Sequence, residues 1–145
     1  MSEPAFPTVT ILKFLQGYKF IVDFGMEGVP KLQVDESKPT GDGSGPNPER
    51  LLSASVGHCL SSSLFFCLNK SRVKINGLQT TVKANIVRNE EGRLRIKNLD
   101  VLIKLDVDEQ DKDRVPHCLE IFENYCTVTE SVIKGLEVEV RTEYV

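Results

Sequence analysis

The chain has 145 residues, enough for one domain with a substantial hydrophobic core, and we expect residues 1–145 to form a single domain. Its 40% hydrophobic and 27% charged residues are ordinary for a soluble globular protein, and a net charge of −3 argues against a nucleic-acid-binding protein. The first residues include a glutamate and two prolines, unlike a secretory signal, and the uninterrupted apolar runs are shorter than the roughly 20 residues of a membrane-spanning helix. We therefore expect a cytoplasmic protein with neither a nucleic-acid nor a membrane partner.

The first part of the chain has the composition of a small β-meander. Residues 8–14 and 18–24 are rich in β-branched and aromatic residues, and Gln16-Gly17 between them indicates a hairpin turn. A third short strand is expected over residues 30–34. The stretch TGDGSGPNP at residues 40–48 cannot form regular structure and predicts a long flexible connection.

A long helix is expected from Pro48 to about Lys70. Asn47 is suited to the N-cap, Pro48 to the first helical position, and Glu49 to the positive end of the helix dipole. Apolar and small residues cover much of the circumference, which is typical of a buried helix.

The second half of the chain continues the α+β pattern. Residues 78–87 and 94–107 predict a hairpin, with its turn at residues 89–92. A helical stretch over residues 108–124 contains Pro116, which should kink or split it.

The chain is expected to end with a short helix over residues 127–134 and a closing strand over residues 136–144. Strands and helices in this order predict an α+β fold with largely antiparallel sheets.

Four cysteines carry the possible chemistry, and in a cytoplasmic protein they are interpreted as thiols before disulfides. They are Cys59, Cys67, Cys118 and Cys126. The only histidines, His58 and His117, directly precede cysteines, and neighbouring residues on a helix point in different directions. We therefore expect no metal site and no cofactor.

Helix geometry restricts which cysteines can pair. Cys59 and Cys67 are eight residues apart on one predicted helix, about 12 Å along its axis, which is too far for a disulfide. The same argument disfavours Cys118 with Cys126. Any disulfide should therefore join one cysteine from each helical region, which leaves four pairings open.

Two of the cysteines have informative surroundings. Thr127 to Glu130 fit an S/T-x-x-E capping box with Thr127 as N-cap, so Cys126 should lie at a helix N-terminus that favours a thiolate. Cys59 lies beside Gly57 and three consecutive serines, which would let a ligand or another backbone approach. A buried core cysteine is the alternative for both, and Cys67 and Cys118 are interpreted as structural.

The glycine-rich segment from Gly41 to Gly45 precedes a helix N-terminus, a place that attracts anions. The Lys-Ser/Thr pair of a P-loop does not follow it, so a mobile connection is favoured over a phosphate site.

Two segments resemble the OsmC/Ohr family of thiol peroxidases. GPNPERLLSASVGHCLSSSL resembles the start of that family's long central helix, with the first cysteine, Cys59, ten residues after Glu49. ENYCTVTESVIKG resembles the second-cysteine motif, with Cys126 in the cysteine position and Thr127 where proline is common. The resemblance covers residues 17–145.

The resemblance implies an OsmC-like fold, with antiparallel six-stranded sheets around a long central helix, in an intertwined homodimer with active sites at its interface. It implies an antioxidant enzyme of the oxidative stress response that reduces organic hydroperoxides. Cys59 would attack the peroxide and become a sulfenic acid, Cys126 would resolve it as a disulfide, and a dithiol reductant of the lipoyl type would restore both thiols. Glu49 would belong to the catalytic set. The capping argument, in contrast, makes Cys126 the more acidic thiol.

One departure keeps other functions open. The family pairs its glutamate with an arginine from an N-terminal strand, but here no arginine precedes Arg50, and Lys19 or Lys31 would have to supply the charge. The first alternative is a binding protein for an apolar thiol or thioester ligand without peroxide turnover. The second is a cysteine-dependent hydrolase or acyl-transfer enzyme, for which His58 is poorly directed.

Overall fold

The computed structural model describes residues 5–145, which form two compact units. The first ends at Leu51 and the second comprises Leu52–Val145. A single domain over the whole chain stays a prediction.

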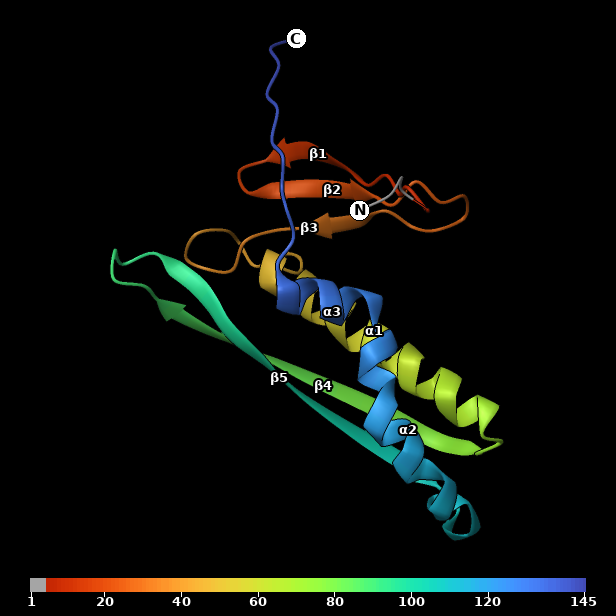
Figure 1. The fold of residues 1–145 in the computed structure, drawn as a ribbon. Coiled ribbons are helices and arrows are strands. Elements are labelled where there is room, and N and C mark those ends of the chain that lie inside the picture. Colours follow the sequence, from red (N-terminus) through yellow and green to blue (C-terminus); the bar gives the residue numbers. More distant parts are fainter. Residues whose placement is uncertain (1–4) are drawn as a thin grey trace. The chain divides into compact units, whose positions relative to one another are not determined.

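The first unit contains the predicted meander, with shorter strands than expected (Figure 1). Strands β1 (Ile11–Gln16), β2 (Lys19–Asp23) and β3 (Leu32–Val34) form an antiparallel sheet in the order β1-β2-β3. Gly17 has a φ of +56°, a conformation that glycine adopts without steric cost, and it allows the tight turn between β1 and β2.

The segment after β3 is irregular, as predicted, but a buried carboxylate organises it. Asp35 is only 3% exposed and accepts hydrogen bonds from the backbone amides of Glu36, Asp42 and Ser44 at 2.8–3.1 Å. The Ser44 hydroxyl donates to the same carboxylate at 2.8 Å. The glycine-rich stretch is therefore wrapped around a side chain rather than being a free linker.

Helix α1 (Pro48–Lys70) has the predicted bounds because its start is encoded locally. The Asn47 side-chain oxygen accepts a hydrogen bond from the Arg50 amide at 3.0 Å, as an N-cap should. In the second unit, a stripe at four-residue spacing on α1 is buried, formed by Val56, Leu60, Leu64 and Leu68. Outside this stripe the helix is open: Phe65 and Phe66 are 52% and 63% exposed, so the helix is less buried than its composition indicated.

Helix α1 is also long and apolar enough to cross a membrane on length and composition alone, with a mean hydropathy of 1.6 over 18 residues. The expectation from uninterrupted apolar runs missed this, because serine and glycine interrupt a run without lowering the average much. Core helices of soluble proteins meet the same criterion, and α1 contributes four side chains to the core of the second unit.

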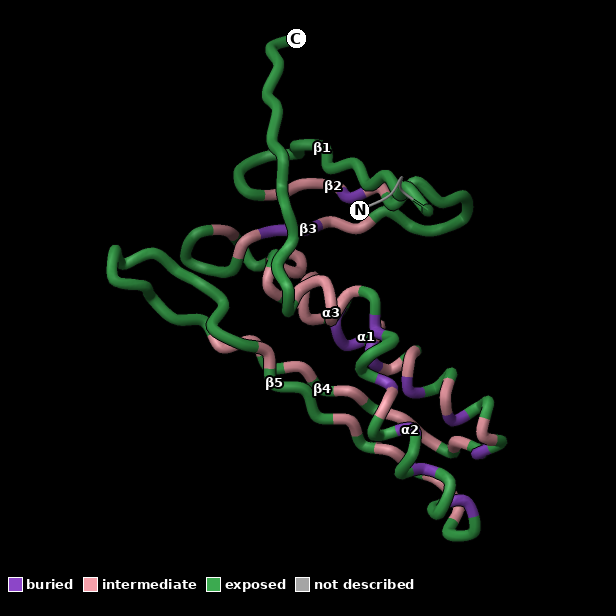
Figure 2. Tube along the Cα trace, viewed as in Figure 1, coloured by how far each residue is buried: buried purple, intermediate pink, exposed green. Residues whose placement is uncertain are grey.

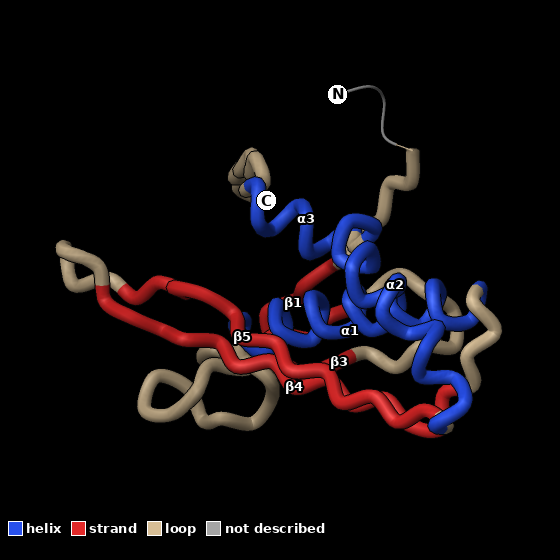
Figure 3. The backbone as a smooth tube through the Cα atoms, turned by 60° about the horizontal axis from the view of Figure 1, so that its bottom comes forward, coloured by secondary structure: helices blue, strands red, loops and turns tan. Residues whose placement is uncertain are grey.

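The second unit also contains the predicted long hairpin. Strands β4 (Ile75–Arg88) and β5 (Leu94–Val107) pair antiparallel, from Ile75 opposite Val107 to Arg88 opposite Leu94. In the turn, the Asn89 amide donates to the Arg93 carbonyl at 2.9 Å, and Gly92 has a φ of +78°. The end of this hairpin projects past the helices (Figure 3).

The helical stretch after β5 is divided as Pro116 predicted. A 3₁₀ helix (Glu109–Arg114) leads into α2 (Val115–Ile121), which has Pro116 in its first turn, where proline is tolerated. A second 3₁₀ helix (Phe122–Tyr125) and then α3 (Thr127–Lys134) follow.

The closing strand predicted over residues 136–144 is wrong. This segment follows Gly135 as an irregular, exposed chain (Figure 2). Leu136, Val138 and Val140 alternate as in a strand, yet they are 66–82% exposed. Alternating apolar residues are not sufficient for a strand, because its backbone must also form hydrogen bonds with a neighbouring strand.

The core of the second unit lies between the helices and one face of β4–β5. Its buried members are Val56, Leu60, Leu64, Leu68, Val73, Val115, Cys118, Phe122 and Cys126. Two of the four cysteines are therefore core residues, and both come from the α2–α3 region.

Candidate functional site: two free cysteines at the start of α3

The structure brings Cys59 and Cys126 together, and both are free thiols. Cys59 is half-buried in the fourth turn of α1, and Cys126, 1% exposed, immediately precedes α3. Their side chains interact through a hydrogen bond. Residues distant in the sequence thus place two sulfur atoms in one site.

The cap of α3 differs from the prediction by one residue. Cys126 is the N-cap, with φ −82° and ψ 100°, and its carbonyl accepts the first helical hydrogen bond from the Glu130 amide at 3.0 Å. No side chain caps the helix, so the predicted capping box with Thr127 is not formed. The backbone amides of the first turn are therefore available to another group.

That group is the sulfur of Cys59. The Val128 amide donates to Cys59 Sγ at 3.4 Å, and the amides of Thr127 and Thr129 contribute to the same interaction. Unpaired amides at a helix N-terminus stabilise negative charge. The start of α3, which the sequence predicted, therefore stabilises a thiolate on Cys59 of α1.

The two thiols have opposite pKa shifts. Burial raises the pKa of Cys59, but the hydrogen bonds from the Cys126 thiol and the three amides outweigh burial, so the pKa lies below its usual range. Burial raises the pKa of Cys126, and the adjacent Cys59 raises it further. The expectation that Cys126 is the more acidic thiol is therefore wrong, because three amides of α3 act on Cys59, whereas on Cys126 burial and the adjacent Cys59 outweigh the one amide of Thr129.

Thr129 is a member of the site that sequence reasoning missed. Thr129 Oγ1 lies 2.9 Å from Cys126 Sγ, and a hydrogen bond from this hydroxyl to the sulfur acts to lower the pKa of Cys126. The available signal was its position in the first turn of the helix that begins after Cys126.

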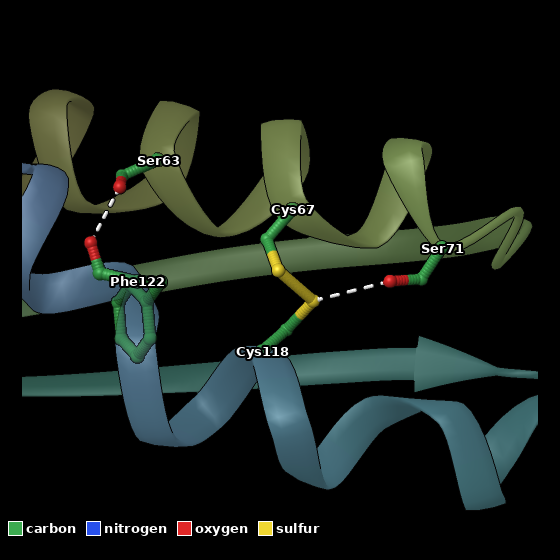
Figure 4. The surroundings of a disulfide bond; sticks show 5 residues. All are labelled: Ser63, Cys67, Ser71, Cys118 and Phe122. Atoms are coloured by element: carbon green, nitrogen blue, oxygen red, sulfur yellow. Dashed lines mark hydrogen bonds between the residues drawn. A yellow bond between two sulfur atoms is a disulfide. The ribbon is translucent and has the colours of Figure 1, made fainter.

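Cys67 and Cys118 form a disulfide between α1 and α2, with an S–S distance of 2.14 Å and Cα atoms 5.6 Å apart (Figure 4). It joins the two helical regions, as the geometric argument required, and it is one of the four pairings left open. Interpreting all four cysteines as thiols first was wrong for this pair.

The remaining predicted residues lie in the first unit. Glu49 occupies the first turn of α1, ten residues before Cys59, which corresponds to about 15 Å along a helix axis. Lys19 forms an ion pair with Asp42 at 2.6 Å, which raises the pKa of Lys19, and Lys31 lies 3.4 Å from Asp23. Both lysines considered as substitutes for an arginine thus have carboxylate partners.

His58 lies on a different side of α1 from Cys59. It lines an open pocket of about 370 Å³ with Gly57, Ser61 and Thr80, against strand β4. Cys59, in contrast, faces α3. Within residues 5–145, no group of three or more His, Cys, Asp or Glu side chains is placed to hold a metal ion.

Comparison with known proteins assigns the family. The pattern of the OsmC-like protein family matches residues 41–141, about two thirds of the chain. The chain belongs to the OsmC-like family. The family predicted from the two cysteine motifs is therefore confirmed.

Solved structures share the OsmC-like fold. An OsmC-like protein of unknown function from Vibrio cholerae superposes with a TM-score of 0.73 at 13% identity, covering 90% of this chain and 94% of that one. An organic hydroperoxide resistance protein from Legionella pneumophila gives 0.66 at 16% identity, covering 90% and 91%. One from Elizabethkingia anophelis, with thiocyanate bound, gives 0.66 at 19% identity and the same coverage. A comparison with curated protein sequences gives no match.

These likenesses confirm the predicted α+β fold with antiparallel sheets and a long helix. In the single chain described from residue 5 onward, the sheets have three and two strands. The six-stranded sheets and the dimer that the resemblance implied stay predictions.

Proposed function

We propose that this OsmC-like protein is a thiol peroxidase that reduces organic hydroperoxides, with Cys59 as the attacking and Cys126 as the resolving cysteine. One observation carries the proposal: the Cys59 sulfur lies both at the amide end of α3 and against the Cys126 thiol. The first contact favours a nucleophilic thiolate, and the second places a partner thiol within reach of the oxidised product. The organic hydroperoxide resistance proteins with the same fold support the substrate class.

In the first step, the Cys59 thiolate attacks the outer oxygen of the hydroperoxide. The S–O bond forms as the O–O bond breaks, and the alkoxide leaves and takes up a proton to become an alcohol. Cys59 is then a sulfenic acid. The buried Cys126 thiol, hydrogen-bonded to Cys59, is the nearest protein group that can supply that proton.

In the second step, Cys126 attacks the Cys59 sulfur as a thiolate. The S–S bond forms, the S–O bond breaks, and the departing hydroxide leaves as water after taking up a proton. Once Cys59 has lost its negative charge, its contribution to raising the pKa of Cys126 is gone and only burial still raises it, while the Thr129 hydroxyl stays in place to donate to the new thiolate. A dithiol reductant of the lipoyl type then returns both cysteines to thiols by disulfide exchange.

The active form is proposed to be an intertwined homodimer. Apolar side chains at the end of the β4–β5 hairpin are 38–56% exposed: Ile86, Val87, Leu94 and Ile96. The alternating segment 136–144 has no partner strand within the described chain. A second copy would cover the apolar side chains of the hairpin and offer segment 136–144 a strand to pair with. Sedimentation of the full chain should therefore give twice the 16.2 kDa mass of one chain.

Glu49 belongs to this proposal as a residue contributed across the dimer. About 15 Å of helix separates it from Cys59 of its own chain, too far for a hydrogen bond. We expect Glu49→Gln to reduce peroxide turnover without changing the alkylation of Cys59 in dilute, monomeric protein.

The decisive experiment is titration of the chain with cumene hydroperoxide, followed by disulfide mapping. Because Cys67 and Cys118 are already bonded, the protein should lose two thiols per chain and gain a Cys59–Cys126 bridge. Cys59→Ser should abolish thiol loss, whereas Cys126→Ser should stop at a sulfenic acid on Cys59. Full turnover by Cys59→Ser would overturn the proposal, and hydrogen peroxide is the matched control for the organic substrate.

A binding protein for an apolar thiol or thioester is a second candidate, favoured by one observation. Lys19 and Lys31 are both paired with carboxylates, so neither is an obvious equivalent of the family's arginine. A binding protein would show a ligand-induced rise in melting temperature without loss of thiols on peroxide addition.

A further inference from the structure

One face of α1 contacts the α2–α3 region at regular intervals. Cys59, Ser63 and Cys67 follow one another every four residues in α1, and Ser71, directly after its last residue, continues the spacing, so the four lie in one row. The Ser63 hydroxyl donates to the Phe122 carbonyl at 2.5 Å, and Ser71 Oγ lies 3.6 Å from Cys118 Sγ (Figure 4). Together with the Cys67–Cys118 disulfide and the Val128–Cys59 contact, they tie residues 118–128 to this row.

We propose that Cys67 and Cys118 are a positioning pair for Cys59: their disulfide holds the segment that carries Cys126 and the α3 amides against the Cys59 sulfur. The inference rests on the proposed function, in which Cys59 attacks the peroxide, but it is tested by alkylation of Cys59 and needs no peroxide turnover. The bond lies two helical turns from Cys59, so it acts through the segment that it anchors.

The anchored segment needs such a tether because its own elements are short. Helix α2 has seven residues, the following 3₁₀ helix has four and α3 has eight, and helices of that length are not stable alone. None of the three has a side-chain cap at its N-terminus. Their placement therefore depends on tertiary contacts with α1.

The hydrogen bonds that join this segment to α1 near the site are weak compared with a covalent bond. The Cys59–Val128 hydrogen bond is 3.4 Å long and involves sulfur, a poor acceptor, and Ser63 holds a single carbonyl. A shift of 1 Å would remove the Val128 amide from hydrogen-bonding range. The disulfide limits such shifts, because Cys118 is fully buried and fixed to the same face of α1.

The pair also has a defined redox chemistry. A dithiol reductant would break the S–S bond and become a cyclic disulfide, leaving two protein thiols on Cys67 and Cys118. Direct exchange with the Cys59–Cys126 pair is disfavoured, because Cys67 and Cys59 are about 12 Å apart along the helix axis. Reduction of the Cys67–Cys118 disulfide should thus free the segment that carries Cys126 to move, without reducing a Cys59–Cys126 disulfide.

The test uses iodoacetamide as a probe of Cys59 and needs no peroxide. A Cys126→Ser chain is prepared with Cys67–Cys118 bonded, and a second sample is reduced with a phosphine and desalted. In this background Cys59 has no resolving partner, so the two samples differ only in the second pair. Mass spectrometry then follows alkylation of the Cys59 peptide at limiting reagent between pH 5 and 9.

We expect reduction to move the midpoint of Cys59 alkylation upward by about half a pH unit or more, which lowers the thiolate fraction below the midpoint by about threefold. The matched control is Cys67→Ala/Cys118→Ala/Cys126→Ser, whose midpoint should match the reduced sample and should not respond to the phosphine. Circular dichroism confirms that each chain is folded. Superimposable profiles for the bonded and reduced samples would overturn the proposal, even if peroxide turnover were established.

Discussion

The sulfur of Cys59 accepts a hydrogen bond from the backbone amide of Val128 at 3.4 Å, although the two residues are 69 positions apart in the chain. This contact explains why the two free thiols differ. Three amides of the first turn of α3 lower the pKa of Cys59, while Cys126, the N-cap of that turn, has a raised pKa and donates a hydrogen bond to the Cys59 sulfur. Backbone amides, burial and the contact between the two sulfur atoms together distinguish a nucleophile from a proton donor.

The first prediction concerns the order in which the thiols react. Iodoacetamide should modify Cys59 before Cys126, with a midpoint below the ordinary cysteine value of about 8.5. Because the pKa of Cys59 is lowered, its thiolate persists as pH falls below that value, and its alkylation should decline only at the lower midpoint. Peptide-resolved mass spectrometry across pH 5–9 measures both rates.

Two variants serve as controls for that profile. Cys126→Ala removes one hydrogen bond to the Cys59 thiolate and should raise the Cys59 midpoint. Val128→Ala keeps the amide and should leave the midpoint nearly unchanged. If Cys126 were alkylated first in the native chain, the assignment of the two roles would be wrong.

The second prediction concerns Thr129. Its hydroxyl lies 2.9 Å from Cys126 Sγ and can donate to the thiolate that resolves the sulfenic acid. Thr129→Val keeps the shape but removes the donor, and the loss of about 1 kcal/mol should slow disulfide formation about fivefold. Stopped-flow measurement of the second step checks this, and dimedone trapping should show a longer-lived sulfenic acid on Cys59.

Rescue by Thr129→Ser separates this role from a packing effect. Serine restores the hydroxyl but not the methyl group, so it should recover most of the rate and the pH dependence of the second step. Equal rates for the valine and native chains would show that the Thr129 hydroxyl does not assist Cys126.

Local signals explain which parts of the fold were predictable. Helix α1 begins where predicted because Asn47 caps it, and α3 ends where predicted because Gly135, with a φ of +80°, follows its last residue. The strand predicted over residues 136–144 was wrong for the opposite reason. Its alternation is a local property, but pairing depends on an edge that the rest of the described chain does not provide.

The site was predictable in its members but not in their chemistry. The motifs identified Cys59 and Cys126, and the capping pattern located the N-cap of α3 to within one residue. Which sulfur receives the amides depends on how α3 packs on α1, and no spacing within residues 126–130 contains that information. The same holds for Cys67–Cys118, because helix geometry left four pairings and only packing selects one.

The third prediction concerns acid sensitivity in the first unit. Hydrogen bonds from Ser44, Glu36 and Asp42 keep the pKa of Asp35 below its ordinary value of about 3.9, despite the opposing effect of burial. A carboxyl group with a lowered pKa stabilises the fold above its unfolded value and loses this effect as pH falls through the folded value. The Ser44 amide should therefore lose protection from hydrogen exchange below about pH 4.

Asp35→Asn is the matched variant for this experiment. It retains one side-chain oxygen but cannot ionise, so protection of the Ser44 amide should be lower at neutral pH and should change little toward acid. A native chain whose Ser44 protection factor stays constant down to pH 2 would contradict the assignment.

The last prediction concerns how closely α1 approaches β4. A Cβ added to Gly57 would lie 2.9 Å from Val82 Cγ2, and beside it the Ser61 and Thr80 hydroxyls are 2.6 Å apart. Alanine is favoured over glycine inside a helix by about 1 kcal/mol, whereas overpacking costs about 1–3 kcal/mol. With Val82 present, we expect overpacking to prevail, so Gly57→Ala should lower the free energy of unfolding.

The Val82→Ala background reverses the sign, because it removes the methyl group that the new Cβ meets. There Gly57→Ala should raise the free energy of unfolding by up to about 1 kcal/mol through helix propensity alone. Urea denaturation of the four chains gives the coupling between the two positions, expected at about 1–2 kcal/mol. Additive effects would mean that Gly57 is not needed for the approach of α1 to β4, and that the helix could tolerate a side chain there without displacing the Cys59 face.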